Sequence, residues 1–194
     1  MKSTHLYIDG QNLFARIRSI LRRRGLLNDL THYDFWGLFN HLFKNENVDL
    51  ATFYFAKLHS SRHTQEKSQE LIEREAQLRK HLEQQGFRYI TGGSVRSRVR
   101  NDGITFEEKG VDVRIAVDIL QDIYEDKVGK IILASSDSDL QPVVYAAKAK
   151  HIPVVYLGFQ VRPNRGLILT TDHTLLVTND DIAHFIIYTN NQME

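Results

Sequence analysis

Short apolar runs alternate with longer amphipathic segments along most of this chain. The runs predict strands at residues 5–8, 50–56, 87–91, 131–134 and 154–157. The segments between them carry apolar residues at helical spacing and predict helices at residues 13–21, 33–45, 64–85, 112–124 and 138–150. Strands that alternate with helices imply right-handed crossovers. The pattern therefore indicates an α/β fold with a mostly parallel central sheet of about five strands and helices on both faces.

Two parts of the chain depart from this alternation. Residues 94–108 predict a hairpin, because Asn101-Asp102-Gly103 has the chemistry of a tight turn between two alternating arms. In residues 162–194 the pattern weakens: 167–170 predict a strand, and 179–181 cap a helix that runs to Tyr188. We expect residues 1–160 to form the main domain and 161–194 to complete it. The apolar segment 185–188 suits either the core or an interface with a second copy or an accessory protein.

Composition narrows the class of protein. The 194 residues are 42% hydrophobic, which is enough for one domain with a full core. The absence of cysteine excludes disulfides, cysteine-ligated zinc and thiol catalysis, and it suits a reducing cytosol. No apolar run approaches the ~18 residues of a membrane span and the N-terminus lacks a signal-peptide core, so we expect a soluble cytoplasmic protein. With a net charge of +1, any nucleic-acid binding must come from local basic patches.

The run at 131–134 ends in polar residues that carry candidate chemistry. Ser138 and Gln141 match a capping box, which predicts that the chain turns from strand into helix here. Asp137 then lies at the carboxyl end of a central strand and Asp139 in the first helical turn. Open α/β sheets carry their sites at this edge. Acids at these positions are also ordinary helix caps, so the pair alone does not decide between capping and catalysis.

Other acids converge on the same edge. Asp9 follows the first predicted strand, and Asp112 opens the helix at 112–124. Carboxylates gathered in this way repel one another unless they surround a divalent cation, and oxygen ligands favour Mg²⁺ or Mn²⁺ over zinc or copper. Asp118 lies inside an otherwise apolar helix, where an unpaired carboxylate is expensive. Either a cation or a structural bond to an amide or an arginine would compensate it.

Several basic and histidine side chains fit both a structural and a functional interpretation. Arg96 and Arg98 share one face of the predicted hairpin, as a charge-protected edge or as a flap over a polyanion. Residues 22–24 are all arginine, and they complement a helix dipole or bind phosphate. His59 and His63 have metal-ligand spacing, but their polar neighbours favour a solvated loop.

Three segments together resemble the signatures of the NYN domain, a branch of the PIN-like nucleases. They are DGQN at residues 9–12, KGVDV at 109–113 with Asp118 beyond it, and SSDSDL at 135–140. Two positions depart from the family pattern, since Ser136 replaces a frequent glycine and Leu140 a frequent phenylalanine. Neither departure removes a carboxylate. The similarity spans residues 5–158, so that 1–160 would be the nuclease domain.

The resemblance implies a Rossmann-like three-layer α/β/α sandwich with divalent-metal-dependent ribonuclease activity. It places Asp9, Asp112, Asp137 and Asp139 in the catalytic and metal-binding cluster, with Asp118 as a further metal ligand and Asn12 as the polar residue that orients water or phosphate. Hydrolysis of an RNA phosphodiester by water activated on Mg²⁺ or Mn²⁺ would follow. Lys109, Arg96 and Arg98 are the candidates for contacts with the RNA backbone.

Other functions fit the sequence less well. A binding or regulatory module that retains the metal pocket but catalyses little is the main alternative. A phosphotransferase of the haloacid-dehalogenase kind needs two aspartates flanking one residue after the first strand, whereas this chain has Asp9-Gly10-Gln11. The sequence has neither the G-x-x-x-x-G-K-[ST] loop of an NTPase nor the G-x-S-x-G elbow of a serine hydrolase.

Overall fold

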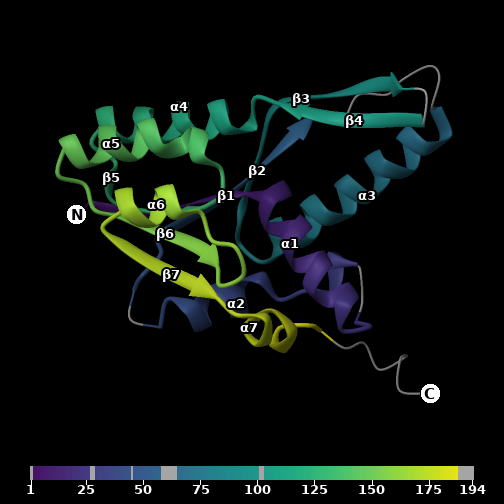
Figure 1. The fold of residues 1–194 in the computed structure, drawn as a ribbon, viewed down its shortest axis with the longest axis horizontal. Helices are drawn as coiled ribbons and strands as arrows, with labels where there is room; N and C mark the ends of the chain where they lie inside the picture. The colour runs from purple at the N-terminus through teal and green to yellow at the C-terminus, as the bar shows by residue number, and fades with distance from the viewer. Residues whose placement is uncertain (1, 27–28, 45, 58–64, 101–102, 188–194) are drawn as a thin grey trace.

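The computed structural model describes residues 2–26, 29–44, 46–57, 65–100 and 103–187 (Figure 1). The elements along the chain are β1 (Ser3–Asp9), α1 (Gly10–Arg23), η1 (Leu30–His32), α2 (Phe35–Leu42), β2 (Leu50–Lys57), α3 (Gln65–Gln84), β3 (Arg88–Arg100), β4 (Gly103–Lys109), α4 (Val111–Tyr124), β5 (Val128–Ala134), η2 (Ser138–Leu140), α5 (Gln141–Ala149), β6 (Val154–Phe159), α6 (Arg165–Thr170), β7 (His173–Val177) and α7 (Asn179–His184).

The described strands form one seven-stranded sheet in the order β4-β3-β2-β1-β5-β6-β7. All neighbouring pairs are parallel except β3 and β4, which form the predicted antiparallel hairpin. The chain builds outward from β1 through β2 and β3, then returns to β5 and builds outward on the other side. The strand order therefore reverses between β1 and β5, which creates a topological switch point at their carboxyl ends.

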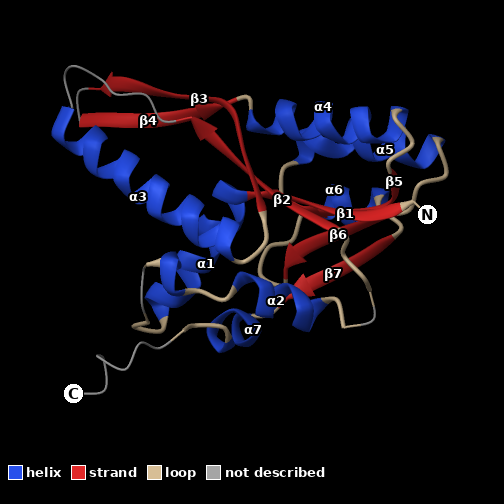
Figure 2. Cartoon of the chain, turned by 180° about the vertical axis from the view of Figure 1, so that it is seen from behind, coloured by secondary structure: helices blue, strands red, loops and turns tan. Residues whose placement is uncertain are grey.

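Helices cover both faces of the sheet, and strand residues alternate between the two. On one face, Leu6 and Ile8 of β1 join a core made with α1, α2, α7 and the end of α3. On the other face, Tyr7 of β1 packs with the inner sides of α4, α5 and α6. Figure 2 shows the strands between these two groups of helices. The predicted three-layer α/β architecture is confirmed, although the sheet described here has seven strands instead of about five.

Two C-terminal predictions are wrong. Residues 167–170 belong to helix α6, and the strand follows at β7. The helix forms because the Asn164 side chain accepts from the Leu167 backbone N–H at 3.0 Å, an N-cap that overrides the strand propensity of a short apolar run. Helix α7 ends at His184, and its capping box is built by Thr178 and Asp181 instead of residue 179.

The last described residues close one side of the core. Ile186 is buried, and Phe185 packs against the core on the α1, α2 and α7 face. Ile187 is partly exposed, and Tyr188 lies outside the described residues. An interface with a second copy or accessory protein at this segment stays a prediction. Within the part of the chain that the structure describes, no helix is long and apolar enough to cross a membrane.

The hairpin sets the start of α4 through a close backbone approach. Gly93 of β3 has φ +72°, and a Cβ at this position would collide with the Lys109 carbonyl oxygen. Gly110 follows with φ +88° and forms the N-terminal boundary of α4. Only glycine allows both the left-handed backbone and the contact without strain. The backbone of residues 109–112 (KGVD), which precedes and begins α4, is therefore held close to the backbone of β3.

We predict that Gly93→Ala lowers the free energy of unfolding by about 2 to 3 kcal/mol, because a left-handed alanine costs roughly 1 kcal/mol and the carbonyl clash adds to it. Gly25→Ala is the matched control, since Gly25 has φ +68° but nothing within 4 Å of its missing Cβ. Urea unfolding of the two variants and the parent checks this. Equal losses in both variants would show that the close approach is unimportant.

Candidate metal centre

The carboxylates predicted from sequence lie at the switch point between β1 and β5. Ile8 of β1 pairs with Ala134 of β5, so these two strands end beside each other. Asp9 is the last residue of β1, and Asp137 follows β5 by three residues. The first turn of α4 brings Asp112 to the same edge. Residues from three separate parts of the sequence therefore share one site.

Asp9 is held in place by hydrogen bonds at both carboxylate oxygens. Oδ1 accepts from the Asn12 backbone N–H at 3.0 Å, which caps α1, and Oδ2 accepts from the Ser135 hydroxyl at 3.1 Å. Burial raises the pKa of Asp9 above its ordinary 3.8, and the negative charges of Asp137 and Asp112 raise it further, although the two hydrogen bonds act in the opposite direction. Ionisation of Asp9 therefore costs more free energy in this site than in water, and a nearby positive charge would reduce that cost.

Ser135 connects the two strand ends. Its side chain is buried; besides donating to Asp9, its oxygen accepts from the Asp137 backbone N–H at 3.1 Å. Asp137 in turn caps η2, because its Oδ1 accepts from the Asp139 backbone N–H at 2.9 Å. The predicted capping box of Ser138 and Gln141 is therefore replaced by a cap at Asp137. Sequence reasoning gave Ser135 no role, and only its place directly after a buried strand could have indicated one.

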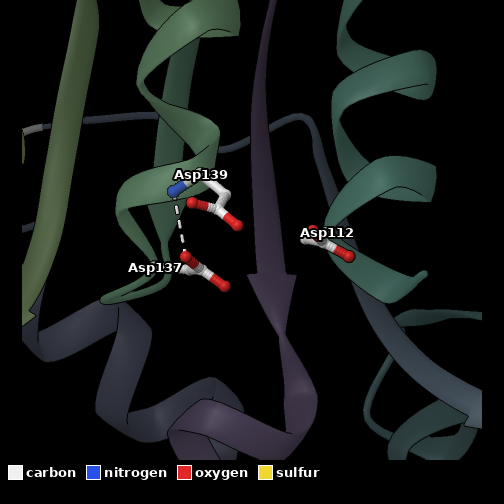
Figure 3. A group of neighbouring side chains, drawn as sticks. All are labelled: Asp112, Asp137 and Asp139. Carbon is white, nitrogen blue, oxygen red and sulfur yellow. Dashed lines mark hydrogen bonds between the residues drawn. The ribbon is translucent and has the colours of Figure 1, made fainter. Parts of the chain in front are cut away.

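Three carboxylates form the centre of the group. Asp112, Asp137 and Asp139 each offer an oxygen, and these oxygens all lie within 4.8 Å of one another. Figure 3 shows Asp137 and Asp139 on one side and Asp112 across from them, with the end of β1 between. Two trans ligands of one Mg²⁺ lie about 4.2 Å apart, twice a bond of about 2.1 Å, so oxygens within 4.8 Å of one another need only small side-chain movements to share one ion. The arrangement fits one hard divalent cation.

A pocket of about 620 Å³ opens in front of the carboxylates. Asp9, Asp112 and Asp137 line it together with Asn12 and Lys109, whose side chain is exposed. Gln11, to which sequence reasoning gave no role, also lines it. The pocket therefore combines an acidic floor with one ammonium group and two amide side chains.

The remaining predicted residues lie elsewhere or are not described. Arg114 Nε donates to Asp118 Oδ1 at 2.8 Å. Burial and the charge of Asp118 raise the pKa of the neighbouring Tyr54 hydroxyl, which therefore keeps its proton. This carboxylate thus has an arginine partner, which was one of its two readings. Arg96 and Arg98 belong to β3, but their side chains fall outside the described part of the structure. His59 and His63 also lie outside the described residues.

An α/β sheet with clustered carboxylates at its switch point is an architecture that can hold a hydrolytic metal site. The NYN domain matches this sequence over residues 3–176, most of the chain. The chain therefore belongs to the NYN domain family of the PIN-like nuclease superfamily, in which divalent-metal dependence and action on RNA are typical.

The other comparisons concern the fold. A crystal structure of a protein of unknown function from Vibrio parahaemolyticus is similar with a TM-score of 0.63 at 19% identity, covering 95% of this chain and 96% of that one. MurG from Acinetobacter baumannii has a TM-score of 0.37 at 10% identity, covering 90% of this chain and 40% of that one, and this similarity carries no argument. No curated protein matches the sequence.

The raised pKa of Asp9 predicts a pH-dependent cost in the metal-free protein. Between 3.8 and the higher folded pKa, the folded state binds more protons than the unfolded state, so stability contributed by Asp9 falls as pH rises through that window. Asp9→Asn removes this loss, and asparagine still caps a helix. Urea unfolding in chelator at several pH values checks this. The free energy of unfolding of Asp9→Asn should increase relative to that of the parent as pH rises through the window.

Asp126→Asn is the control for this series, because Asp126 is an exposed surface carboxylate that pairs with Lys2. The free energy of unfolding of Asp126→Asn, relative to the parent, should not show the increase with pH that is expected for Asp9→Asn. A pH-independent difference between Asp9→Asn and the parent would contradict the proposed cost of burying Asp9.

Proposed function

We propose that this protein is a divalent-metal-dependent ribonuclease that hydrolyses RNA phosphodiester bonds at the switch-point pocket. The observation that carries the proposal is the group of Asp112, Asp137 and Asp139, whose carboxylate oxygens lie within 4.8 Å of one another beside that pocket. Membership of the NYN family supports the reaction class and the RNA substrate. The cysteine-free sequence suits a reducing compartment, and we place the enzyme in the cytoplasm.

The donor set favours Mg²⁺ or Mn²⁺. All candidate ligands are carboxylate oxygens, which hard cations prefer and which suit zinc or copper less well. Asp112, Asp137 and Asp139 would hold the ion. Asp9 would be a further ligand, because each of its oxygens accepts one hydrogen bond and keeps a second lone pair. When bound, the cation supplies a Lewis acid for the phosphate and lowers the pKa of a water.

The protein's own residues then position the substrate. Lys109 lines the pocket next to α4 and offers three donors to phosphate oxygens without reading sequence. Asn12 is fixed at the start of α1 and orients a water or a phosphate through its side-chain amide. Ser135 keeps Asp9 and the Asp137 backbone in register, so the acids face the pocket before substrate arrives.

Asp137→Asn should reduce metal-dependent RNA cleavage by at least about a hundredfold, because it removes the negative charge of one of the three carboxylates proposed to hold the ion. The neutral amide keeps the cap of η2, so folding is preserved. Cleavage of pooled single-stranded and hairpin RNAs with Mg²⁺, Mn²⁺ or chelator measures the effect. Asp126→Asn, a surface change of the same chemistry, should cleave like the parent. Parental activity in a folded Asp137→Asn protein would refute the assignment.

Metal binding can be measured without turnover. A ligand that binds only the folded state stabilises it by about 2.7 kcal/mol at a hundred times its Kd. Mn²⁺ and Mg²⁺ should therefore raise the Tm of the parent and of Asp126→Asn but raise that of Asp139→Asn much less, in thermal scans against chelator. A full metal response in Asp139→Asn would place the ion elsewhere. Metal-dependent stabilisation without any cleavage would instead favour the binding or regulatory module.

A further inference from the structure

One stripe of polar side chains runs along α1 from the acidic pocket. Asn12, Arg16, Ser19 and Arg23 are spaced by four, three and four residues, so they share one side of the helix. The distance from Asn12 to Arg23 along the axis is about 16 Å, at 1.5 Å per residue. The stripe therefore leads from the candidate metal centre to the far end of α1.

A second pocket lies at the far end of this stripe. Its volume is about 90 Å³, and its lining includes Arg16, Ser19, Arg23 and Arg24 with Phe159 and Val161. A space of roughly 10 to 15 Å³ on this measure holds one water, so the pocket has room for a group as small as a phosphate. Three arginines, Arg16, Arg23 and Arg24, line this one small volume, which we call the α1 pocket.

The α1 pocket is preorganised and retains free donors. Arg16 donates to the Val161 carbonyl and lies over the Phe159 ring, 5.7 Å from its centroid, which fixes the guanidinium. Within the described part of the chain, its other N–H groups have no acceptor. Arg24 is paired with Asp180 of α7. Among the described residues, the Arg23 side chain has no hydrogen bond or ion pair. Arg23 can thus bind a ligand with its whole guanidinium, Arg16 with the donors that Val161 does not use, and Arg24 is held by Asp180.

The helix dipole does not account for this arrangement. Favourable charge interactions with a helix end fall off within the last turn. Arg22 and Arg23 lie in the last turn of α1, but Arg16 lies near the middle. Arg16 is also turned toward β6, whose Phe159 lines both the α1 pocket and a narrow pocket that Asn12 shares with the acidic site. Asn12 and Phe159 both line this narrow space, so the acidic pocket and the α1 pocket lie near each other along α1 and β6.

We propose that the α1 pocket is a subsite for an RNA backbone phosphate, a few nucleotides along the strand from the bond that is cut. This inference rests on the proposed ribonuclease function and adds a direction to it. RNA would cross the acidic centre, follow Asn12 along α1 and end with a phosphate bound by Arg16 and Arg23. The subsite recognises the charge of a phosphate and its distance from the cleaved bond, and it contacts no base. It therefore favours RNAs that are long enough to place a phosphate there.

Arg23→Ala tests the subsite, and Arg22→Ala is its matched control. Both changes remove one exposed arginine from the same helical turn, but Arg22 does not line the α1 pocket. Ser19→Glu places an anion in the pocket without removing an arginine. Fluorescence anisotropy in chelator and at low salt measures the Kd of labelled single-stranded RNAs of increasing length, independently of cleavage. Salt titrations of each protein give the number of phosphate contacts.

For RNAs long enough to reach the α1 pocket, Arg23→Ala should weaken binding several-fold and lower the salt slope by about 0.7, the value of one contact on a single strand. Ser19→Glu should weaken binding at least as much, while Arg22→Ala should match the parent. The shortest RNAs should bind all four proteins alike. Equal losses in the two arginine variants, or no RNA binding by the parent, would overturn the subsite.

The failure of this inference differs from failure of the proposed function. If the parent cleaves RNA and the Arg23→Ala, Ser19→Glu and Arg22→Ala proteins bind and cleave alike, the subsite is refuted while the nuclease stands. If Arg23 and Ser19 control RNA binding but no cleavage occurs with Mg²⁺ or Mn²⁺, the subsite is supported and the nuclease assignment fails.

Discussion

The parallel pairing of β1 with β5 is the constraint on which the site depends. Because Ile8 lies beside Ala134, the chain leaves both strands at one edge of the sheet. The later strands build outward on either side, so the gap above this pair stays open as a pocket. Asp9 and Asp137 therefore lie close enough for their charges to interact although they are far apart in sequence. Burial is the main cause of the raised pKa of Asp9, and the negative charge of Asp137 adds to it.

Local folding and the site use the same carboxylates. Asp9 caps α1 and Asp137 caps η2, so capping and metal binding are compatible roles. Asp137 uses only Oδ1 for its cap, which leaves Oδ2 for another partner. Asp9 uses both oxygens as hydrogen-bond acceptors, and the oxygens that lie within 4.8 Å of one another belong to Asp112, Asp137 and Asp139. Repulsion within this group is a cost that a bound cation would offset.

Much of the fold could be predicted from sequence because buried parallel strands leave continuous apolar runs, as at residues 131–134, and acids directly after such runs mark the sheet edge. The strand expected at 167–170 failed because a run of that length has no distinguishing period, and the deciding bond came from Asn164. The link through Ser135 and the α1 pocket could not be predicted, because no pattern in the sequence indicates which distant acceptor the Ser135 hydroxyl or the Arg16 guanidinium meets.

The most direct test of the central claim is the position of a bound ion. Anomalous diffraction from crystals of the parent protein grown with Mn²⁺ locates the metal without reference to activity. The account predicts a peak among the carboxylates of Asp112, Asp137 and Asp139, with metal to oxygen distances of about 2.0 to 2.3 Å for ligands in direct contact. A peak at Asp118 alone, or none at the switch point under saturating Mn²⁺, would contradict it.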